Sequence, residues 1–134
     1  MRRLILLAAL FLGACVQPGA PAACTAPLKP ALEVDLYFGR SKPGGGEVSE
    51  AEWTAFLADT VTPRFPAGLS VLNVEGQYRG PSGSIARERS KLVVIVVFDA
   101  PAHQARVREI IDAYSSRFSQ QSVLRSERSV CASL

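Results

Sequence analysis

Hydrophobic and polar residues alternate along residues 31–39, which is the period of a strand with one buried face. The apolar members of this segment are Leu32, Val34, Leu36 and Phe38. The tetrapeptide Ser-Glu-Ala-Glu that begins at Ser49 is typical of a capping box at the start of a helix. Apolar residues at helical spacing continue to Val61, and Pro63 and Pro66 end the helix. The pattern therefore predicts a strand followed by a helix.

The second half of the chain predicts a hairpin, a helix and a last strand. Residues 69–79 predict a second strand, and the turn-forming residues 80–84 lead into a third strand that ends near Phe98. Asp99 and the proline two residues later mark the start of a second helix. Its apolar stripe consists of Val107, Ile110, Ile111, Tyr114 and Phe118. Residues 122–130 predict the last strand.

This β-α-β-β-α-β order is that of an α+β fold, the ferredoxin-like sandwich. Two right-handed crossovers produce a four-stranded antiparallel sheet in the order 4-1-3-2, with both helices on one face. The first and last strands are then antiparallel neighbours.

The start of the chain has the pattern of an export signal. Two arginines precede the apolar residues 4–14, a run too short to span a bilayer. The tetrapeptide Leu-Gly-Ala-Cys that ends at Cys15 resembles the lipobox of bacterial lipoproteins. The resemblance implies that Cys15 carries diacylglycerol on its thiol and an acyl chain such as palmitate on its amino group. An ordinary secretory signal cut after Ala20 or Ala23 is the alternative.

Three segments follow from this pattern. Residues 1–14 form the lipoprotein signal peptide, residues 15–30 the lipidated cysteine with a proline-rich tether, and residues 31–134 a single ferredoxin-like domain. We expect a periplasm-facing protein of the cell envelope, anchored in the membrane through its lipid. Val16 stands where an aspartate retains many lipoproteins in the inner membrane, which favours the outer membrane.

The basic charge of the chain belongs mostly to this signal. Hydrophobic residues make up 48% of the chain and charged residues 20%, which is typical of a globular protein. Removing Arg2 and Arg3 with the signal leaves 13 of the 15 basic residues against 12 acidic ones, a net charge of +1. Electrostatic binding of nucleic acid therefore has no support.

Lipidation of Cys15 leaves Cys24 and Cys131 as the remaining cysteines. Thiols beyond the inner membrane are commonly oxidised, and neighbouring first and last strands bring these two residues to the same edge of the sheet. We therefore predict a disulfide, with two free thiols as the alternative. The chain has one histidine and no paired-cysteine motif, so no metal site and no cofactor is predicted.

Several segments together resemble one bacterial family, the domains of unknown function numbered 3574. They are residues 36–39, 44–46, 48–53, 61–66 and 118–125. The resemblance extends over about residues 32–131 and implies an exported, single-domain protein. It implies no activity and no catalytic residue.

No segment carries a catalytic motif. His103 lies in the first turn of the second predicted helix, where a solvated or capping role is expected, and no partner is placed to orient it as a base. The glycines Gly44–Gly46 lack the Lys-Ser/Thr of a phosphate-binding loop and predict a flexible connection. Trp53 belongs to a helical apolar stripe, which favours core packing.

The third strand is apolar on both sides, so something should cover the sheet face opposite the helices. We expect Val93, Ile95 and Val97 on that face. The predicted ligand-binding residues are Tyr37, Gln77, Arg79, Lys91 and Arg125. An apolar floor with several cationic donors suits a small anionic ligand that carries a carboxylate or a phosphate.

Three functions follow from this picture. The first is a non-enzymatic domain that binds a small ligand or assembles as a homodimer through the open sheet face, with the dimer favoured over the ligand site. The second is a small cofactor-independent enzyme that uses Tyr37 or an acidic side chain on that face, which rests on fold analogy alone. The third is a purely structural envelope protein that contacts another protein.

Overall fold

The structure is a computed structural model that describes residues 23–134. The predicted signal peptide, Cys15 and the tether as far as residue 22 lie outside the described residues. Within residues 23–134, no helix is long and apolar enough to cross a membrane.

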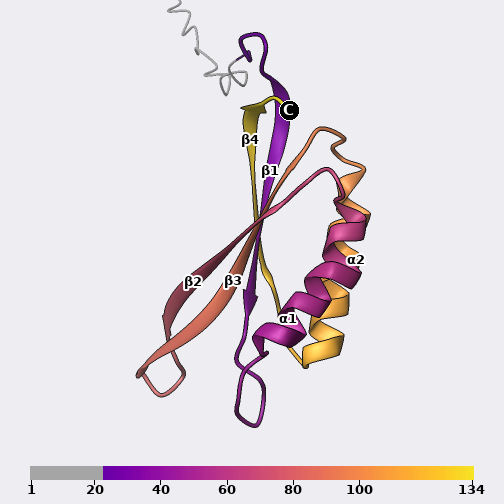
Figure 1. The fold of residues 1–134 in the computed structure, drawn as a ribbon. Helices are drawn as coiled ribbons and strands as arrows, with labels where there is room; N and C mark the ends of the chain where they lie inside the picture. Colours follow the sequence, from indigo (N-terminus) through magenta and orange to yellow (C-terminus); the bar gives the residue numbers. More distant parts are fainter. Residues whose placement is uncertain (1–22) are drawn as a thin grey trace, which may run out of the picture.

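Six main elements follow one another in the predicted order. They are β1 (Lys29–Gly39), α1 (Glu50–Phe56), β2 (Ser70–Arg79), β3 (Ile85–Val97), α2 (His103–Phe118) and β4 (Leu124–Ala132). The strands form one antiparallel sheet in the order β2-β3-β1-β4, and both helices cover the same face of it (Figure 1). The predicted α+β ferredoxin-like fold is confirmed, because 4-1-3-2 is this same order read from the other edge.

Local sequence signals set the ends of the helices. At the start of α1, Glu52 N–H donates to Ser49 Oγ at 3.2 Å and Ser49 N–H donates to Glu52 Oε2 at 2.8 Å, which is the predicted capping box. The chain then continues through a π-helical turn, Leu57–Val61, and a 3₁₀ turn, Thr62–Arg64. Ser119 ends α2 in the left-handed conformation, with φ 55°.

Aromatic rings fill the space between the sheet and the helices. The cluster consists of Phe38 from β1, Trp53 and Phe56 from α1, and Tyr114 and Phe118 from α2. The rings of Phe38 and Tyr114 lie 4.7 Å apart between centroids at an interplanar angle of 67°, an edge-to-face arrangement. Burial raises the pKa of Tyr114, and its hydroxyl donates to the carbonyl of Gly39 at 2.8 Å. Trp53 has the core role that the sequence predicts.

The two faces of β3 are the reverse of the prediction. Val34 lies opposite Ile95 and Leu36 opposite Val93, and directly paired residues of antiparallel strands point to the same face. Because Val34 and Leu36 pack under the helices, Val93, Ile95 and Val97 are in the core. The alternate residues Leu92, Val94 and Val96 lie on the face without helices. A run of seven apolar residues has no period of two, so the sequence did not determine which set faces inward.

The predicted disulfide joins Cys24 to Cys131, with 5.6 Å between the Cα atoms. It links the segment before β1 to β4 at the end of the sheet where Lys29 pairs with Ala132. The start of β1 and the end of β4 lie side by side there (Figure 1). This end of the molecule, into which the predicted tether leads, is called the tether end below.

Candidate functional site

The sheet face opposite the helices is not covered by any of the residues that the structure describes, and we call it the open face (Figure 1). The strand registers place apolar or aromatic residues from all four strands on it. They include Tyr37, Leu72, Val74, Tyr78, Leu92, Val94, Val96 and Leu124. Leu72, Tyr78, Val96 and Leu124 are among the most exposed large hydrophobic residues of the domain.

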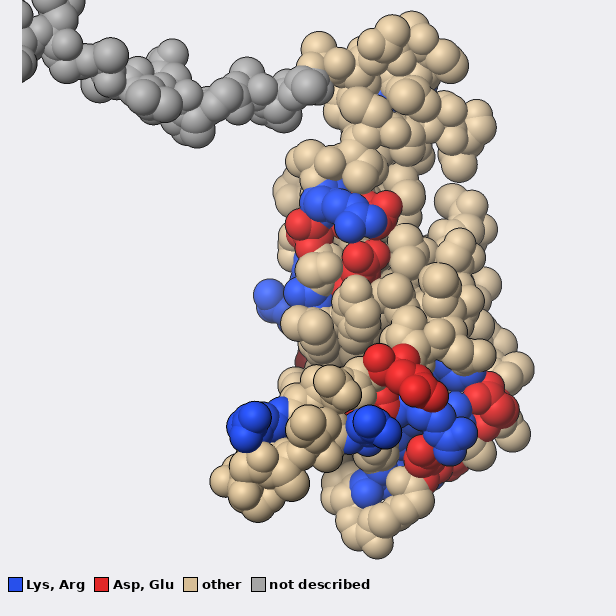
Figure 2. All heavy atoms as spheres, turned by 90° about the vertical axis from the view of Figure 1, so that its left-hand side faces the viewer, with Lys and Arg blue, Asp and Glu red and all other residues tan. Residues whose placement is uncertain are grey.

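On the open face, one group of charged residues lies along β1 and its border with β4. Arg128 of β4 is paired directly with Glu33 of β1 and donates a hydrogen bond to its carboxylate. Asp35, between Val94 and Ser126, is buried although it lies on this face, and its Oδ1 has no hydrogen-bond partner among the described residues. A buried acceptor without a donor is uncommon in folded proteins. Charged side chains gather in separate groups on this side of the molecule (Figure 2).

A groove of about 640 Å³ lies on the open face at the end away from the disulfide, and we call it the distal groove. Tyr37, Tyr78 and Leu124 supply its large apolar surfaces, and Glu88 and Gln120 supply polar groups. The Glu88 carboxylate accepts the N–H of Ser41 at 3.2 Å. It also lies so close to Gly39 that a Cβ there would approach Glu88 Oε1 to 2.6 Å, so Gly39 leaves room for this carboxylate.

The β2–β3 hairpin extends beyond the rest of the sheet. Pairing of β1 with β3 ends at Gly39 and Ser90, whereas β2 and β3 stay paired as far as Arg79 and Ile85. The projecting part, residues 76–88, swings away from the helices (Figure 1). We call it the hairpin arm.

The structure does not bring the five predicted ligand residues together. Tyr37 is on the open face and lines the distal groove. Gln77 and Arg79 lie on the hairpin arm with their side chains on the opposite side of the sheet from Tyr78, and Arg79 donates to the carbonyl of Gly83 at 3.1 Å. Lys91 and Arg125 pair with Phe38 and Leu36, which places both on the helix face.

Lys91 is buried beside α1 and has two partners. Its Nζ donates to Glu50 Oε2 at 2.7 Å and to Asn73 Oδ1 at 2.6 Å. The hydrogen bond from Lys91 lowers the pKa of Glu50. The prediction that Lys91 lies on the open face is therefore wrong. Lys91 lies on the same side of β3 as Val93, and its ammonium reaches the carboxylate of Glu50 at the start of α1.

Arg125 belongs to a polar group between β4 and α2. It donates to Gln104 Oε1 at 2.7 Å and also to Glu127, whose Oε1 lies 3.1 Å from His103 Nε2. Burial raises the pKa of Glu127, but the hydrogen bonds and charges of Arg125 and His103 together lower it by more, so the pKa lies below its ordinary value. His103 is buried, with Nδ1 unpartnered among the described residues, so the prediction of a solvated position is wrong.

A network of ion pairs fastens the loop between β1 and α1. Its members are Arg40, Lys42, Glu47, Glu50, Glu52, Arg89 and Lys91. The hydrogen bond from Lys42, ahead of those from Ser49, lowers the pKa of Glu52 from its ordinary 4.5 to about 2. Within residues 23–134, no group of three or more His, Cys, Asp or Glu residues could hold a metal ion. The ion pairs of Arg89 with Glu47 and of Arg40 and Lys91 with Glu50 link the loop to β3 and to the start of α1.

Solved structures of two kinds share this fold. A phage SAM lyase in complex with S-methyl-5'-thioadenosine matches with a TM-score of 0.58 and 13% identity, covering 78% of this chain and 90% of that chain. The phage SAM lyase in its apo state matches at 0.56, with 16% identity and coverage of 78% and 86%. CutA from Synechococcus elongatus matches at 0.52, with 15% identity and coverage of 80% and 86%. At these identities the likeness shows the fold alone.

In sequence, one family matches: DUF3574, described as a protein of unknown function, matches residues 33–134. No curated protein is similar enough in sequence to match the chain.

Proposed function

The chain belongs to the DUF3574 family of proteins of unknown function, and we propose that it is a non-enzymatic assembly domain of the cell envelope that associates with a second copy through its open face. A lipid on Cys15 anchors it, facing the periplasm and in the outer rather than the inner membrane. The alternative of a cofactor-independent enzyme would use the same face.

One observation carries the proposal: the outward positions of the central strand β3 from Leu92 to Val96 are apolar. An antiparallel sheet with one face in water normally has polar residues at its outward positions. Here these positions hold Leu92, Val94 and Val96, with Leu72 beside them on β2. An exposed apolar patch spread over neighbouring strands is typical of a protein–protein interface.

The hairpin arm favours a second copy as the partner. A two-stranded ribbon is marginally stable by itself in water, and this one exposes Tyr78 and Ile85 on opposite sides. A second copy related by a two-fold axis would cover the open face with its own open face, and the same contact would support the hairpin arm. The border of the face carries neighbouring opposite charges, Glu33 and Arg128, which such a copy can meet with its own pair.

The test compares two adjacent residues of β2. Leu72 lies on the open face with 46% of its surface exposed, whereas Val71 lies on the other side and is 37% exposed. In protein exported without its anchor (Cys15→Ser), we expect Leu72→Glu to raise the dimer dissociation constant about 100-fold or more, because an unpaired carboxylate is costly inside an interface. Val71→Glu is expected to leave it unchanged.

Light scattering across a concentration series measures the mass, and circular dichroism checks the fold. A monomeric Cys15→Ser protein at tens of micromolar would contradict the proposal. So would an equal loss of association in Leu72→Glu and Val71→Glu.

The distal groove supports a second candidate, binding of a small molecule. Its volume of about 640 Å³ is that of a typical ligand site. Two tyrosine rings and Leu124 offer apolar surface to a planar ring, and the Glu88 carboxylate offers an acceptor to hydroxyl or amino groups. Because Lys42 is paired with Glu52, the groove favours a neutral or cationic ligand over the anion expected from the sequence. The phage SAM lyase with its bound S-methyl-5'-thioadenosine suggests that nucleoside as a probe.

Calorimetric titration of S-methyl-5'-thioadenosine into the Cys15→Ser protein tests this candidate. We expect Glu88→Gln to weaken binding about tenfold, since it removes the charge of the acceptor and keeps its shape. Glu75→Gln serves as the matched control, because Glu75 of β2 lies on the opposite side of the sheet from the groove. This variant should bind the nucleoside as tightly as the Cys15→Ser protein does. Equal affinities of these two variants, or no heat from the parent protein at millimolar nucleoside, would count against the groove as its site.

A further inference from the structure

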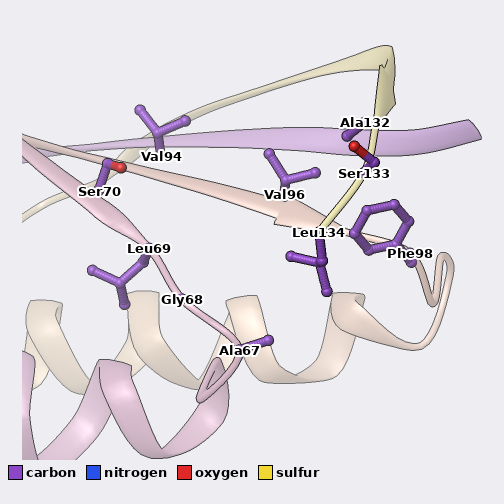
Figure 3. Close-up of a pocket in the computed structure, with 10 residues that line it drawn as sticks. All are labelled: Ala67, Gly68, Leu69, Ser70, Val94, Val96, Phe98, Ala132, Ser133 and Leu134. Carbon is purple, nitrogen blue, oxygen red and sulfur yellow. The ribbon is translucent and has the colours of Figure 1, made fainter. Parts of the chain in front are cut away.

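The tether end exposes large hydrophobic side chains from separate parts of the chain. Leu28, just before β1, is 41% exposed, and Phe98, just after β3, is 43% exposed. Leu134 is fully exposed beyond β4. Figure 3 shows Phe98 next to Leu134, with Val96 farther along β3, around an apolar hollow of about 310 Å³. Leu28, Phe98 and Leu134 lie beyond the ends of the strands, whereas Val96 belongs to the open face, which the hollow adjoins.

Few charges accompany this apolar group. In Figure 2, the upper end of the described residues is almost free of charged side chains, which gather farther down. Asp99 and Arg106, near Phe98, form an ion pair at 2.6 Å. Lys29 is exposed at the start of β1, beside Leu28. An exposed lysine next to exposed apolar side chains is typical of a surface that meets lipid headgroups.

The position of the predicted anchor selects the bilayer as the partner of this end. Cys24 lies nine residues after Cys15 and is fixed to β4 by the disulfide. Nine residues span at most about 30 Å when fully extended, so the anchored chain keeps the tether end close to the membrane surface. The short tether produces a high effective concentration, and a patch too small to bind membranes alone can then stay in contact.

We propose that the tether end rests on the bilayer, with Leu28, Phe98 and Leu134 inserted at the level of the headgroups and Lys29 among the lipid phosphates. The proposal rests on the lipid anchor of the proposed function. The contact orients the domain with the hairpin arm and the distal groove pointing away from the membrane, where a second copy or a ligand can reach them.

The experiment uses the full lipoprotein in vesicles of phosphatidylethanolamine and phosphatidylglycerol. An environment-sensitive fluorophore is attached at Ala100→Cys, two residues after Phe98, or at Ser82→Cys, in the turn of the hairpin arm. We expect lipids that carry a quencher in the bilayer to reduce the emission of the Ala100 probe about twofold and to leave the Ser82 probe unchanged. Phe98→Glu should abolish quenching at Ala100, whereas Val71→Glu should not.

Three results would overturn the proposal. In protein that sediments with the vesicles, the lipid quencher could leave the Ala100 probe as bright as the Ser82 probe. That result would show that the anchor is present and that the tether end does not touch the bilayer. The Ala100 probe could show the same emission, typical of an apolar environment, in Cys15→Ser protein without vesicles as in the lipoprotein in vesicles. That result would mean that a second copy, and not the bilayer, covers this end. Mass spectrometry could find Cys15 without lipid, which removes the anchor of the proposed function and this inference with it.

Discussion

Replacement of both Cys24 and Cys131 by serine is expected to lower the free energy of unfolding by about 4–5 kcal/mol, because the disulfide closes a loop with a sequence separation of 107 residues. The bond restricts the unfolded chain far more than it restricts the folded one. A loss of this size is a large part of the stability of a small domain and corresponds to a fall in the melting temperature of roughly 20–30 °C.

The position of β4 adds a local consequence. Among residues 23–134 this strand is at the edge of the sheet and pairs only with β1, and most of its side chains are exposed. Its ladder, the disulfide and the hydrogen bonds of Arg125 and Glu127 to α2 hold it in place, with Val123 as the neighbouring residue in the core. Without the bond, we expect the amide protons of β4 to exchange first.

Urea denaturation of three samples measures the effect: oxidised parent, reduced parent and the double serine variant. The reductant should shift the midpoint of the parent and leave that of the serine variant unchanged, which separates the disulfide from any general effect of the reductant. Coincident midpoints of the oxidised and reduced parent would show that the bond contributes no stability.

Periodic segments made the fold predictable from the sequence. The alternation in residues 31–39 defined both the strand and its buried face, and the capping box at Ser49 defined the start of α1 within one residue. The order of elements then restricted the sheet to one right-handed arrangement. That arrangement also placed Cys24 beside Cys131, because the first and last strands had to be neighbours.

The site was less predictable, because its strands lack such a period. From Arg125 to Arg128 the sequence of β4 is polar at every position, so nothing in it showed that Arg125 and Glu127 face α2. Lys91 reaches Glu50 because its side chain is long. A pattern of polar and apolar positions contains no information about side-chain length, so it could not predict this ion pair. The distal groove is lined by Tyr37, by Tyr78 and by the segment before β4. Of these, only Tyr37 lies in a segment whose alternating pattern predicts the face of the sheet.

The faces of β3 provide the second large expected effect, a comparison of Ile95→Asp with Val96→Asp. Ile95 is 1% exposed in the core, whereas its neighbour Val96 is 38% exposed on the open face. An ionised carboxylate at position 95 would lie in the hydrophobic core with Val34 and Val93, and burial of a charge among apolar side chains costs about 4–5 kcal/mol or more.

We therefore expect Ile95→Asp protein to be unfolded or degraded, and Val96→Asp protein to keep its circular dichroism spectrum and lose the proposed dimer. The same change at adjacent positions then separates the requirements of the fold from those of the interface. A folded Ile95→Asp monomer would instead show that Ile95 faces outward, and the register of β1 and β3 would have to move by one residue. In that case Leu92, Val94 and Val96 would form the core, and the assignment of the open face would be reversed.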